Sequence, residues 1–286
     1  MFFKIDKKIL ATNDGIYTGV VIVEGIDNKK ESAGIHEILQ NEVRIISESF
    51  ADKSVKGVKE LDLYREALKS YNINPSKYPC SIEALLNRIV KKGEFPSISP
   101  IVDLANYISL KYKVPVGVHD TDSLDNDLVV RLSNDDDCKI EDNNGNDVLK
   151  PGEPIYTCGH SVRTRRWMWR QLPAGRVDEN STNFILPIDG FYANHDRVDA
   201  AINELCELIK KYEVIDPKAY PQFEEMVASL VERRNGKMTE EELEIENQIS
   251  IMLKGVAQHT AISDIRKKLN QAKKENRPLR IKLGLD

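Results

Sequence analysis

The organisation of this chain is clearest in residues 81–107, which read SIEALLNRIVKKGEFPSISPIVDLANY. Apolar residues recur at helical spacing from Ser81, and Lys92-Gly93 ends that helix. Residues 95–100 form an extended connection, because prolines punctuate them. Helical periodicity returns over residues 101–112. The segment therefore predicts two helices joined by an extended linker.

The residues before this segment predict one strand and two further helices. Strand-forming residues fill positions 16–23 with apolar side chains on both faces, so we expect this strand to be buried on two sides. Apolar residues at helical spacing predict helices over residues 31–52 and 58–71.

Beyond Val114 the pattern changes to short strands and turns, which continue to about residue 188. Residues 114–118 are strand-like, and residues 128–132 are clearly so. Asn144-Gly145 is a pair typical of tight hairpin turns. A calcium loop is the alternative there, but the glycine is misplaced for that pattern and no glutamate closes the loop. We therefore favour a solvated hairpin.

After Asp196 the chain becomes helical and stays so, with its first helix expected over residues 198–212. Prolines at positions 217 and 221 interrupt the helical pattern once. We expect an α+β domain over residues 1–213 and an α-helical C-terminal extension over residues 214–286.

Composition excludes several classes of protein. The chain has 286 residues, a net charge of −5 and 41% hydrophobic residues, which is the profile of a globular protein. No apolar run approaches the ~20 residues that span a bilayer, and the N-terminus lacks the apolar stretch of a secretory signal. We therefore expect a cytoplasmic protein without membrane contact. No feature of the sequence predicts its oligomeric state.

The cysteines and the known catalytic signatures predict no cofactor. Four cysteines lie at positions 80, 138, 158 and 206, too sparse for a disulfide framework and without zinc-ligand spacing, so we expect reduced, buried thiols. The sequence holds no GxSxG, Walker, GxGxxG or HExxH pattern. This argues against a nucleotide-driven enzyme and against a zinc hydrolase. A site assembled from distant segments is not excluded.

Residues 163–171, RTRRWMWRQ, combine four arginines with both tryptophans of the chain. Arginine binds phosphate bidentately, and tryptophan and arginine planes stack on bases. The pattern therefore predicts RNA contact through the four arginines, Arg163, Arg165, Arg166 and Arg170. The alternative is that Trp167 and Trp169 share one strand face as core, while the arginines pair with surface carboxylates.

A second basic region lies at the C-terminus. Residues 263–286 carry eight basic against three acidic side chains, a net of +5. Lys267 and Lys268 are its candidates for phosphate contact. The alternative is the solvated face of a helix.

A set of landmarks occurs in order along the middle of the chain. It comprises Ser81–Arg88, Gly93, Pro96, Asp103–Tyr107, Pro115 and Asp120. This set resembles the tRNA-binding editing module of the phenylalanyl-tRNA synthetase beta subunit, which is formed by the third and fourth domains of that subunit. The resemblance covers roughly residues 1–212 and is closest to free-standing versions of the module.

The resemblance implies a layered α+β fold, in which sheets pack as a β-sandwich flanked by helices. It also implies an aminoacyl-tRNA ligand, because in the synthetase this module hydrolyses tyrosine wrongly attached to the tRNA for phenylalanine. Nothing in the chain matches an aminoacylation site, so we expect a protein that does not charge tRNA.

The resemblance also points to individual site residues. Asn106 matches the asparagine of the family's Asp-Val-Thr-Asn-Tyr segment, whereas Ala105 stands where a threonine is usual. The family histidine falls at Gly117, and His119 lies two residues later, on the same strand face. The family glutamate falls near Pro187, and Asp189 is the nearest acid.

These positions imply roles in the hydrolysis of an aminoacyl ester. Asn106 and His119 are the catalytic candidates, with Asn106 orienting the amino acid or the water and His119 acting as base or donor. Asp189 would bind the substrate ammonium, with Gly117 and Trp167 as further substrate-binding residues.

Three functions follow. The first is an ester hydrolase that clears mischarged aminoacyl-tRNA in trans. The second is a non-catalytic tRNA- or RNA-binding module, and the third is a pocket protein that binds a free amino acid.

Overall fold

The computed structural model describes residues 3–13, 15–29, 32–50, 54–93, 95–137 and 148–213. The hairpin expected at Asn144-Gly145, the helical extension over residues 214–286, and Lys267 and Lys268 lie outside the described residues. The domain boundary after residue 213 therefore stays a prediction.

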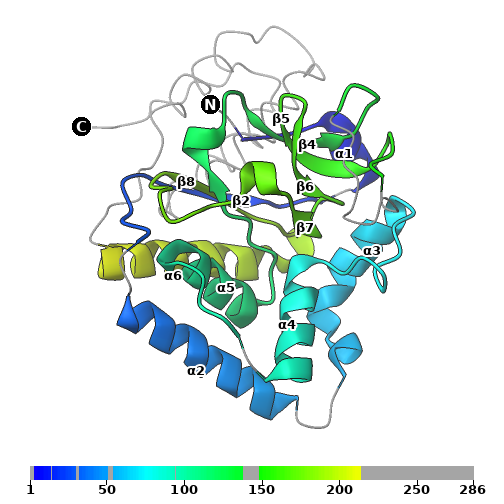
Figure 1. The fold of residues 1–286 in the computed structure, drawn as a ribbon. Helices are drawn as coiled ribbons and strands as arrows, with labels where there is room; N and C mark the ends of the chain where they lie inside the picture. The colour runs from blue at the N-terminus through cyan, green and yellow to red at the C-terminus, as the bar shows by residue number, and fades with distance from the viewer. Residues whose placement is uncertain are drawn as a thin grey trace, which may run out of the picture.

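The strands form two sheets (Figure 1). The first is a mixed sheet of five strands in the order β1-β4-β5-β6-β7, in which only the β1–β4 pair is parallel. Its strands are β1 (Phe3–Ile5), β4 (Leu128–Leu132), β5 (Pro154–Cys158), β6 (Ser161–Arg165) and β7 (Arg170–Gln171). The second sheet is antiparallel and has the order β2-β8-β3, with β2 (Gly19–Val23), β8 (Phe184–Ile188) and β3 (His119–Asp120).

Most of the α-helices lie on one side of these sheets, whereas the N-terminal one packs on β4, as Figure 1 shows. The α-helices are α1 (Lys7–Thr12), α2 (Ala33–Ser49), α3 (Asp62–Ser70), α4 (Ser81–Lys92), α5 (Pro100–Tyr112) and α6 (His195–Glu213). Short 3-10 turns are η1 (Val55–Gly57), η2 (Lys59–Leu61), η3 (Thr121–Ser123), η4 (Pro173–Gly175) and η5 (Tyr192–Asn194). Helix α6 packs on β2 and β8, α5 packs on α6, and α2 packs on α5.

The connection between α4 and α5 is fixed by local chemistry. Gly93 ends α4 with a φ of 66°, a left-handed conformation that glycine adopts at little cost. The buried carboxylate of Asp103 in the first turn of α5 accepts from the backbone N–H of Ile98 at 2.9 Å and from the Ser97 hydroxyl. These bonds hold the linker close to α5, as expected for an acid near a helix N-terminus.

The two larger hydrophobic cores among the described residues both pack against the sheets. The first contains Val20 and Ile185 from the antiparallel sheet together with Val130 and Tyr156 from the mixed sheet, so the two sheets share one core. The second joins the antiparallel sheet to α5 and α6, with residues such as Leu186, Leu104 and Ile202. The α+β class with two sheets and flanking helices is confirmed, and neither sheet closes into a barrel within the described part of the chain.

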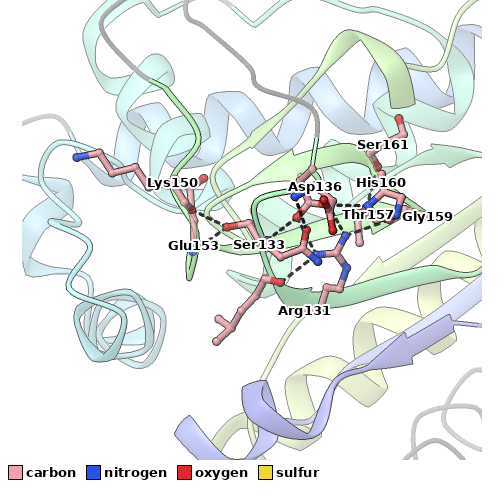
Figure 2. A network of polar contacts seen from close by, with 12 residues as sticks. Arg131, Ser133, Asp136, Lys150, Glu153, Thr157, Gly159, His160 and Ser161 are labelled. Atoms are coloured by element: carbon pink, nitrogen blue, oxygen red, sulfur yellow. Dashed lines mark hydrogen bonds and ion pairs between the residues drawn. The ribbon is translucent and has the colours of Figure 1, made fainter.

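A polar network lies where β4 of the mixed sheet ends (Figure 2). Arg131 at the end of β4 donates to Asp137 Oδ2 at 2.8 Å and to the backbone oxygen of Gly159 at 3.1 Å. Burial alone raises the pKa of Asp137, but the bonds from Arg131 and from the Asn134 N–H hold the pKa below its ordinary value. Ser133 Oγ also donates to Lys150 O at 2.6 Å. The network therefore ties β4 to the turn between β5 and β6.

Most predicted elements are present. The strand expected over residues 16–23 is β2, which has side chains buried on both faces. The helices expected over 31–52, 101–112 and 198–212 are α2, α5 and α6, and the one beginning at Ser81 is α4. The helix expected over 58–71 is confirmed only in part, as η2 followed by α3.

The strand predicted over residues 114–118 was wrong. Val116 makes an isolated bridge to Ile188, and the strand β3 begins only at His119. The Gly117 N–H donates to Pro187 O and the Asp189 N–H donates to Pro115 O, but Pro187 of β8 has no N–H to donate to Gly117 in return, which interrupts regular pairing before His119. Strand β1 and helix α1 were not predicted at all.

The described cysteines agree with the predicted reduced thiols, because Cys80, Cys158 and Cys206 are free and buried. Cys138 lies outside the described residues. Among the described residues no cluster of histidine, cysteine and acidic side chains is suited to hold a metal ion. None of the described helices has the length and apolar character needed to cross a bilayer.

Candidate functional site

One cavity collects the residues that the sequence analysis singled out. It has a volume of about 320 Å³ and lies between α5, the segment 115–119, the turn between β6 and β7, and the end of β8. Five predicted site residues line it: Asn106, Gly117, His119, Trp167 and Asp189. They come from four separate parts of the chain, so the fold is what brings them together. Apolar side chains such as Val102, Val116 and Val118 form much of the remaining wall.

Asp189 is the acidic group of the cavity and is 3% exposed. Its Oδ1 accepts from Tyr156 Oη at 2.8 Å, from Trp167 Nε1 at 3.0 Å and from Thr18 Oγ1 at 3.3 Å. Among the described residues, its Oδ2 accepts only from the shared Tyr156 hydroxyl, at 2.9 Å. No described residue forms an ion pair with this carboxylate. Burial raises its pKa to about 6, so the group is ionised at neutral pH and has acceptor capacity left for a cationic ligand.

Two tyrosines hold Asp189 in place. Tyr64 Oη donates to the Asp189 backbone oxygen at 3.3 Å and accepts from Asn194 Nδ2 at 2.8 Å. Burial raises the pKa of Tyr64 and of Tyr156 above the ordinary tyrosine value. Both phenols therefore stay protonated and act as donors, which stabilises the carboxylate in one orientation.

His119 lies beside this network and is 1% exposed. Its ring stacks on Tyr156 with centroids 5.5 Å apart and an interplanar angle of 29°. Burial, with a smaller contribution from the Arg163 charge, lowers the pKa of His119 to about 3. The imidazole is therefore neutral at physiological pH. Gly117 lines the same cavity, as expected for residues two apart on one strand-like segment.

Asn106 lies on α5 and is partly buried at the cavity wall. No described residue forms a hydrogen bond with its side chain. An asparagine in a helix interior has a modest intrinsic cost, and here it makes no internal bond that offsets that cost. Its amide is therefore available to a ligand. Ala105 lines the cavity beside it.

Comparison with known proteins assigns this chain to a family. The family model of the B3/4 domain matches residues 63–213, which is more than half of the chain. The chain belongs to the B3/4 domain family. This confirms the resemblance to the module formed by the third and fourth domains of the phenylalanyl-tRNA synthetase beta subunit.

Several chains of solved structures are similar to this B3/4 domain protein. One of them is an N-terminal fragment of the phenylalanyl-tRNA synthetase beta-subunit from Pyrococcus horikoshii, with 11% sequence identity and a TM-score of 0.40. The match covers 74% of this chain and 48% of that fragment, so the chain spans about half of the fragment's length. No curated protein sequence matches at a significant level.

The arginine cluster of this B3/4 domain protein differs from the exposed patch that was predicted. Arg163, Arg165 and Arg166 are each at most 5% exposed. Arg165 donates to both carboxylate oxygens of Glu153, at 2.6 and 2.7 Å. These three side chains are turned inward, so we do not retain them as RNA-binding residues. Arg170 on β7 is exposed and remains a candidate.

The alternative that the two tryptophans share one face of a strand is also wrong. They lie in the turn between β6 and β7, where Arg166 and Trp167 have φ values of 50° and 55°. Trp167 is buried in the first core, whereas Trp169 is partly exposed and stacks edge-on against Tyr78. The Arg166 guanidinium lies 3.6 Å from the Tyr78 ring centroid and 4.4 Å from that of Trp169.

Sequence reasoning missed Tyr156 and Thr18, which both bond to Asp189. Each lies in or beside an apolar strand, where a hydroxyl gives no distinct signal. Two hydroxyl groups among buried strand residues do require partners. That requirement was the available clue, but the partner becomes identifiable only once the fold is known.

Proposed function

We propose that this B3/4 domain protein binds the aminoacylated 3′ end of tRNA and hydrolyses the ester of mischarged aminoacyl-tRNA in trans. It does so in the cytoplasm and without aminoacylation activity of its own. The observation that supports this most is the convergence of Asn106, His119 and Asp189 on one cavity.

The cavity suits the amino acid part of such a substrate. The Asp189 carboxylate accepts the substrate ammonium, because it is buried, ionised at neutral pH and without an ionic partner among the described residues. The valines of the wall contact the amino acid side chain. A volume of about 320 Å³ admits one amino acid and lies at the small end of ligand sites.

The reaction is a simple ester hydrolysis. The oxygen of a water molecule bonds to the acyl carbon, and the bond from that carbon to the ribose oxygen breaks. One proton of the water ends on the ribose oxygen, so the products are a free amino acid and a tRNA with a free terminal hydroxyl. Asn106 and His119 both line the cavity. In this proposal they orient the water or stabilise the negative charge that develops on the carbonyl oxygen.

Deacylation of a panel of mischarged tRNAs tests this proposal. Wild type should exceed spontaneous hydrolysis, and Asn106→Ala should lower the rate about 100-fold, which is typical for the loss of one stabilising group. Asn41→Ala on α2 is the matched control, because the exposed Asn41 side chain accepts a hydrogen bond from Arg44, forms no other with the described residues, and does not line the cavity. A wild-type rate equal to spontaneous hydrolysis on every tRNA would sink the proposal.

The burial of three arginines favours a second candidate, a pocket protein that binds a free amino acid. Of the four clustered arginines only Arg170 is exposed, so this cluster provides little phosphate-binding surface. Free amino acids would then raise the melting temperature while tRNA would not. Salt-sensitive tRNA binding without turnover would instead indicate a non-catalytic RNA-binding module.

A further inference from the structure

A glutamine on the cavity wall has a side-chain amide whose orientation is fixed by its neighbours. Gln171 Nε2 donates to Val118 O at 2.6 Å and to Gly175 O at 2.7 Å. An amide nitrogen carries two protons, so both donors of this group are used. The opposite orientation would bring Oε1 against two carbonyl oxygens, which have no proton to donate. The oxygen Oε1 is therefore the atom of this amide that remains available.

The strand register places this side chain on the cavity side of the mixed sheet. Gln171 lies opposite Thr164 in the β6–β7 pair, and Thr164 lies opposite Tyr156 in the β5–β6 pair. Side chains of directly opposed residues share one face of a sheet. All three residues line the cavity, whereas the preceding Arg170 is exposed. The three side chains therefore form one row across the cavity wall.

The Gln171 oxygen is an accessible acceptor. No described residue donates a hydrogen bond to Oε1, and this atom does not belong to the fully buried polar atoms that lack a partner. The Thr164 hydroxyl likewise forms no hydrogen bond with the described residues. A hydroxyl both donates and accepts, so Thr164 suits either kind of ligand group. Gln171 suits a donor alone.

A fixed acceptor discriminates between ligands more sharply than an amide that is free to rotate. A rotating glutamine offers either its N–H groups or its oxygen, whereas this one offers its oxygen in every case. A ligand oxygen without a proton would be repelled there. An apolar ligand group would exclude water and leave Oε1 unsatisfied, which costs binding free energy. A ligand hydroxyl would instead donate to it.

We propose that Gln171 is a specificity-determining residue of this cavity, which selects ligands that carry a hydroxyl group in addition to an ammonium group. Asp189 bonds to Tyr156 at the other end of the row, and no hydrogen bond joins Gln171 to either residue. Adjacent strands lie about 4.8 Å apart, so the backbones of Tyr156 and Gln171 are separated by roughly 10 Å. The two polar groups therefore contact different parts of a ligand.

Two parts of an aminoacyl-tRNA carry such a hydroxyl. One is the side chain of a hydroxylated amino acid, and the other is the ribose carbon beside the ester bond. The ribose source and the ammonium at Asp189 rest on the proposed function. The fixed orientation of Gln171 does not, and it applies equally to a free amino acid in the cavity.

Binding of probe pairs that differ by one hydroxyl tests the proposal. The amino acid pairs are threonine with valine and tyrosine with phenylalanine, each as the free amino acid and as its 3′-aminoacylamino-adenosine. The ribose pair is the valine conjugate with its 2′-deoxy analogue. Wild type should prefer the hydroxylated member by about three- to tenfold, which is typical for one hydrogen bond. The pair that shows this preference identifies the source of the hydroxyl. Equal affinities within every pair would overturn the proposal.

Gln171→Met removes the acceptor and should abolish the preference. Gln40→Met is the matched control, because Gln40 is also partly buried and donates through Nε2 to Phe95 O at 3.0 Å, but does not line the cavity. If Gln171→Met does not fold, Gln171→Lys provides the second variant. A lysine ammonium donates to carbonyl oxygens and accepts nothing, and its added charge cancels within each pair. A preference that persists in either Gln171 variant would refute the role of Gln171.

The outcomes for Gln171 and for the proposed function are separate. Deacylation is not measured in these binding experiments. If free amino acids bind and the adenosine conjugates do not, the proposed function fails, whereas the threonine–valine and tyrosine–phenylalanine pairs still decide the role of Gln171. If wild type binds none of the probes, both proposals are wrong.

Discussion

The indole Nε1 of Trp167 donates to Asp189 Oδ1 over 3.0 Å and joins the turn between β6 and β7 to the end of β8. Trp167 has a φ of 55°, which is uncommon for a residue other than glycine and costs about 1 kcal/mol or more. The Asp189 bond and burial of the ring in the first core offset that cost. The geometry of the turn and that of the carboxylate therefore depend on each other.

Replacing this tryptophan should destabilise the protein more than replacing its neighbour. Trp167→Phe removes the N–H that bonds to the buried Asp189 and leaves space in the core, so we expect a loss of about 2–4 kcal/mol in the free energy of unfolding. Trp169→Phe alters a partly exposed ring and should cost less than about 1.5 kcal/mol. Urea unfolding of both variants measures the difference, and equal losses would contradict the role given to the Asp189 bond.

The low pKa of His119 makes stability depend on pH. Because the folded protein lowers this pKa to about 3 from 6.5, the unfolded chain binds the proton between these values and the folded one does not. The contribution of His119 is therefore fully present above pH 6.5 and is lost as pH falls, at about 1.4 kcal/mol for each pH unit. His119→Gln has no such proton to bind, so its free energy of unfolding should fall less than that of wild type between pH 6.5 and pH 4.

Comparison of these two proteins isolates His119 from other titrating groups. Asp189 acts in the opposite sense, because its raised pKa makes the folded state hold a proton up to about pH 6. That effect is present in both proteins and cancels in the difference. Parallel stability curves for wild type and His119→Gln would show that the histidine is not buried in its neutral form.

The glycine that ends α4 provides a test of backbone conformation alone. Gly93 has a φ of 66°, and an added Cβ would meet no atom of the described residues within 4 Å. Gly93→Ala should therefore cost about 1 kcal/mol of stability from the left-handed conformation only. Gly57→Ala also meets no atom within 4 Å but carries no positive φ, so it should be nearly neutral or slightly stabilising. Thermal unfolding of the pair checks this, and the prediction fails if Gly57→Ala loses as much as Gly93→Ala.

The sequence predicted the helices better than the small strands, for a physical reason. Helices α2, α4, α5 and α6 are long enough for apolar residues to recur over several turns. Strand β1 has only three residues, so no alternation can be recognised, and its place is defined by parallel pairing with β4 far along the chain. That pairing depends on the tertiary structure, which the local sequence pattern does not predict.

The site was predicted unevenly for a related reason. Asn106, His119 and Asp189 followed from the ordered landmarks of the family, and the fold does bring them to one cavity. The arginines were judged from composition, which records that guanidinium groups are clustered but not which way they point. The fold turns Arg163 and Arg165 inward to carbonyl and carboxylate partners. The number of arginines was therefore a poor guide to exposed positive charge.

Ligand binding should depend on the ionisation of Asp189. Burial raises the pKa of this carboxylate to about 6, so it is charged at pH 7 and increasingly protonated below pH 6. A ligand with a free ammonium should lose about tenfold in affinity for each pH unit below 6, because only the charged form makes the ion pair. A stable 3′-aminoacylamino-adenosine is a suitable probe for calorimetry, since its amide resists hydrolysis.

Two comparisons separate this ion pair from a general effect of acid on the fold. The N-acetylated probe has no ammonium, so its affinity should be weaker at pH 7 and should change little between pH 7 and pH 5. Asp189→Asn keeps an acceptor for Trp167 and Tyr156 but removes the charge, so the free-amine probe should bind it weakly at every pH. Equal affinity of both probes for wild type at pH 7 would show that Asp189 serves only to hold Trp167 and Tyr156, and that the ammonium of any substrate is bound elsewhere.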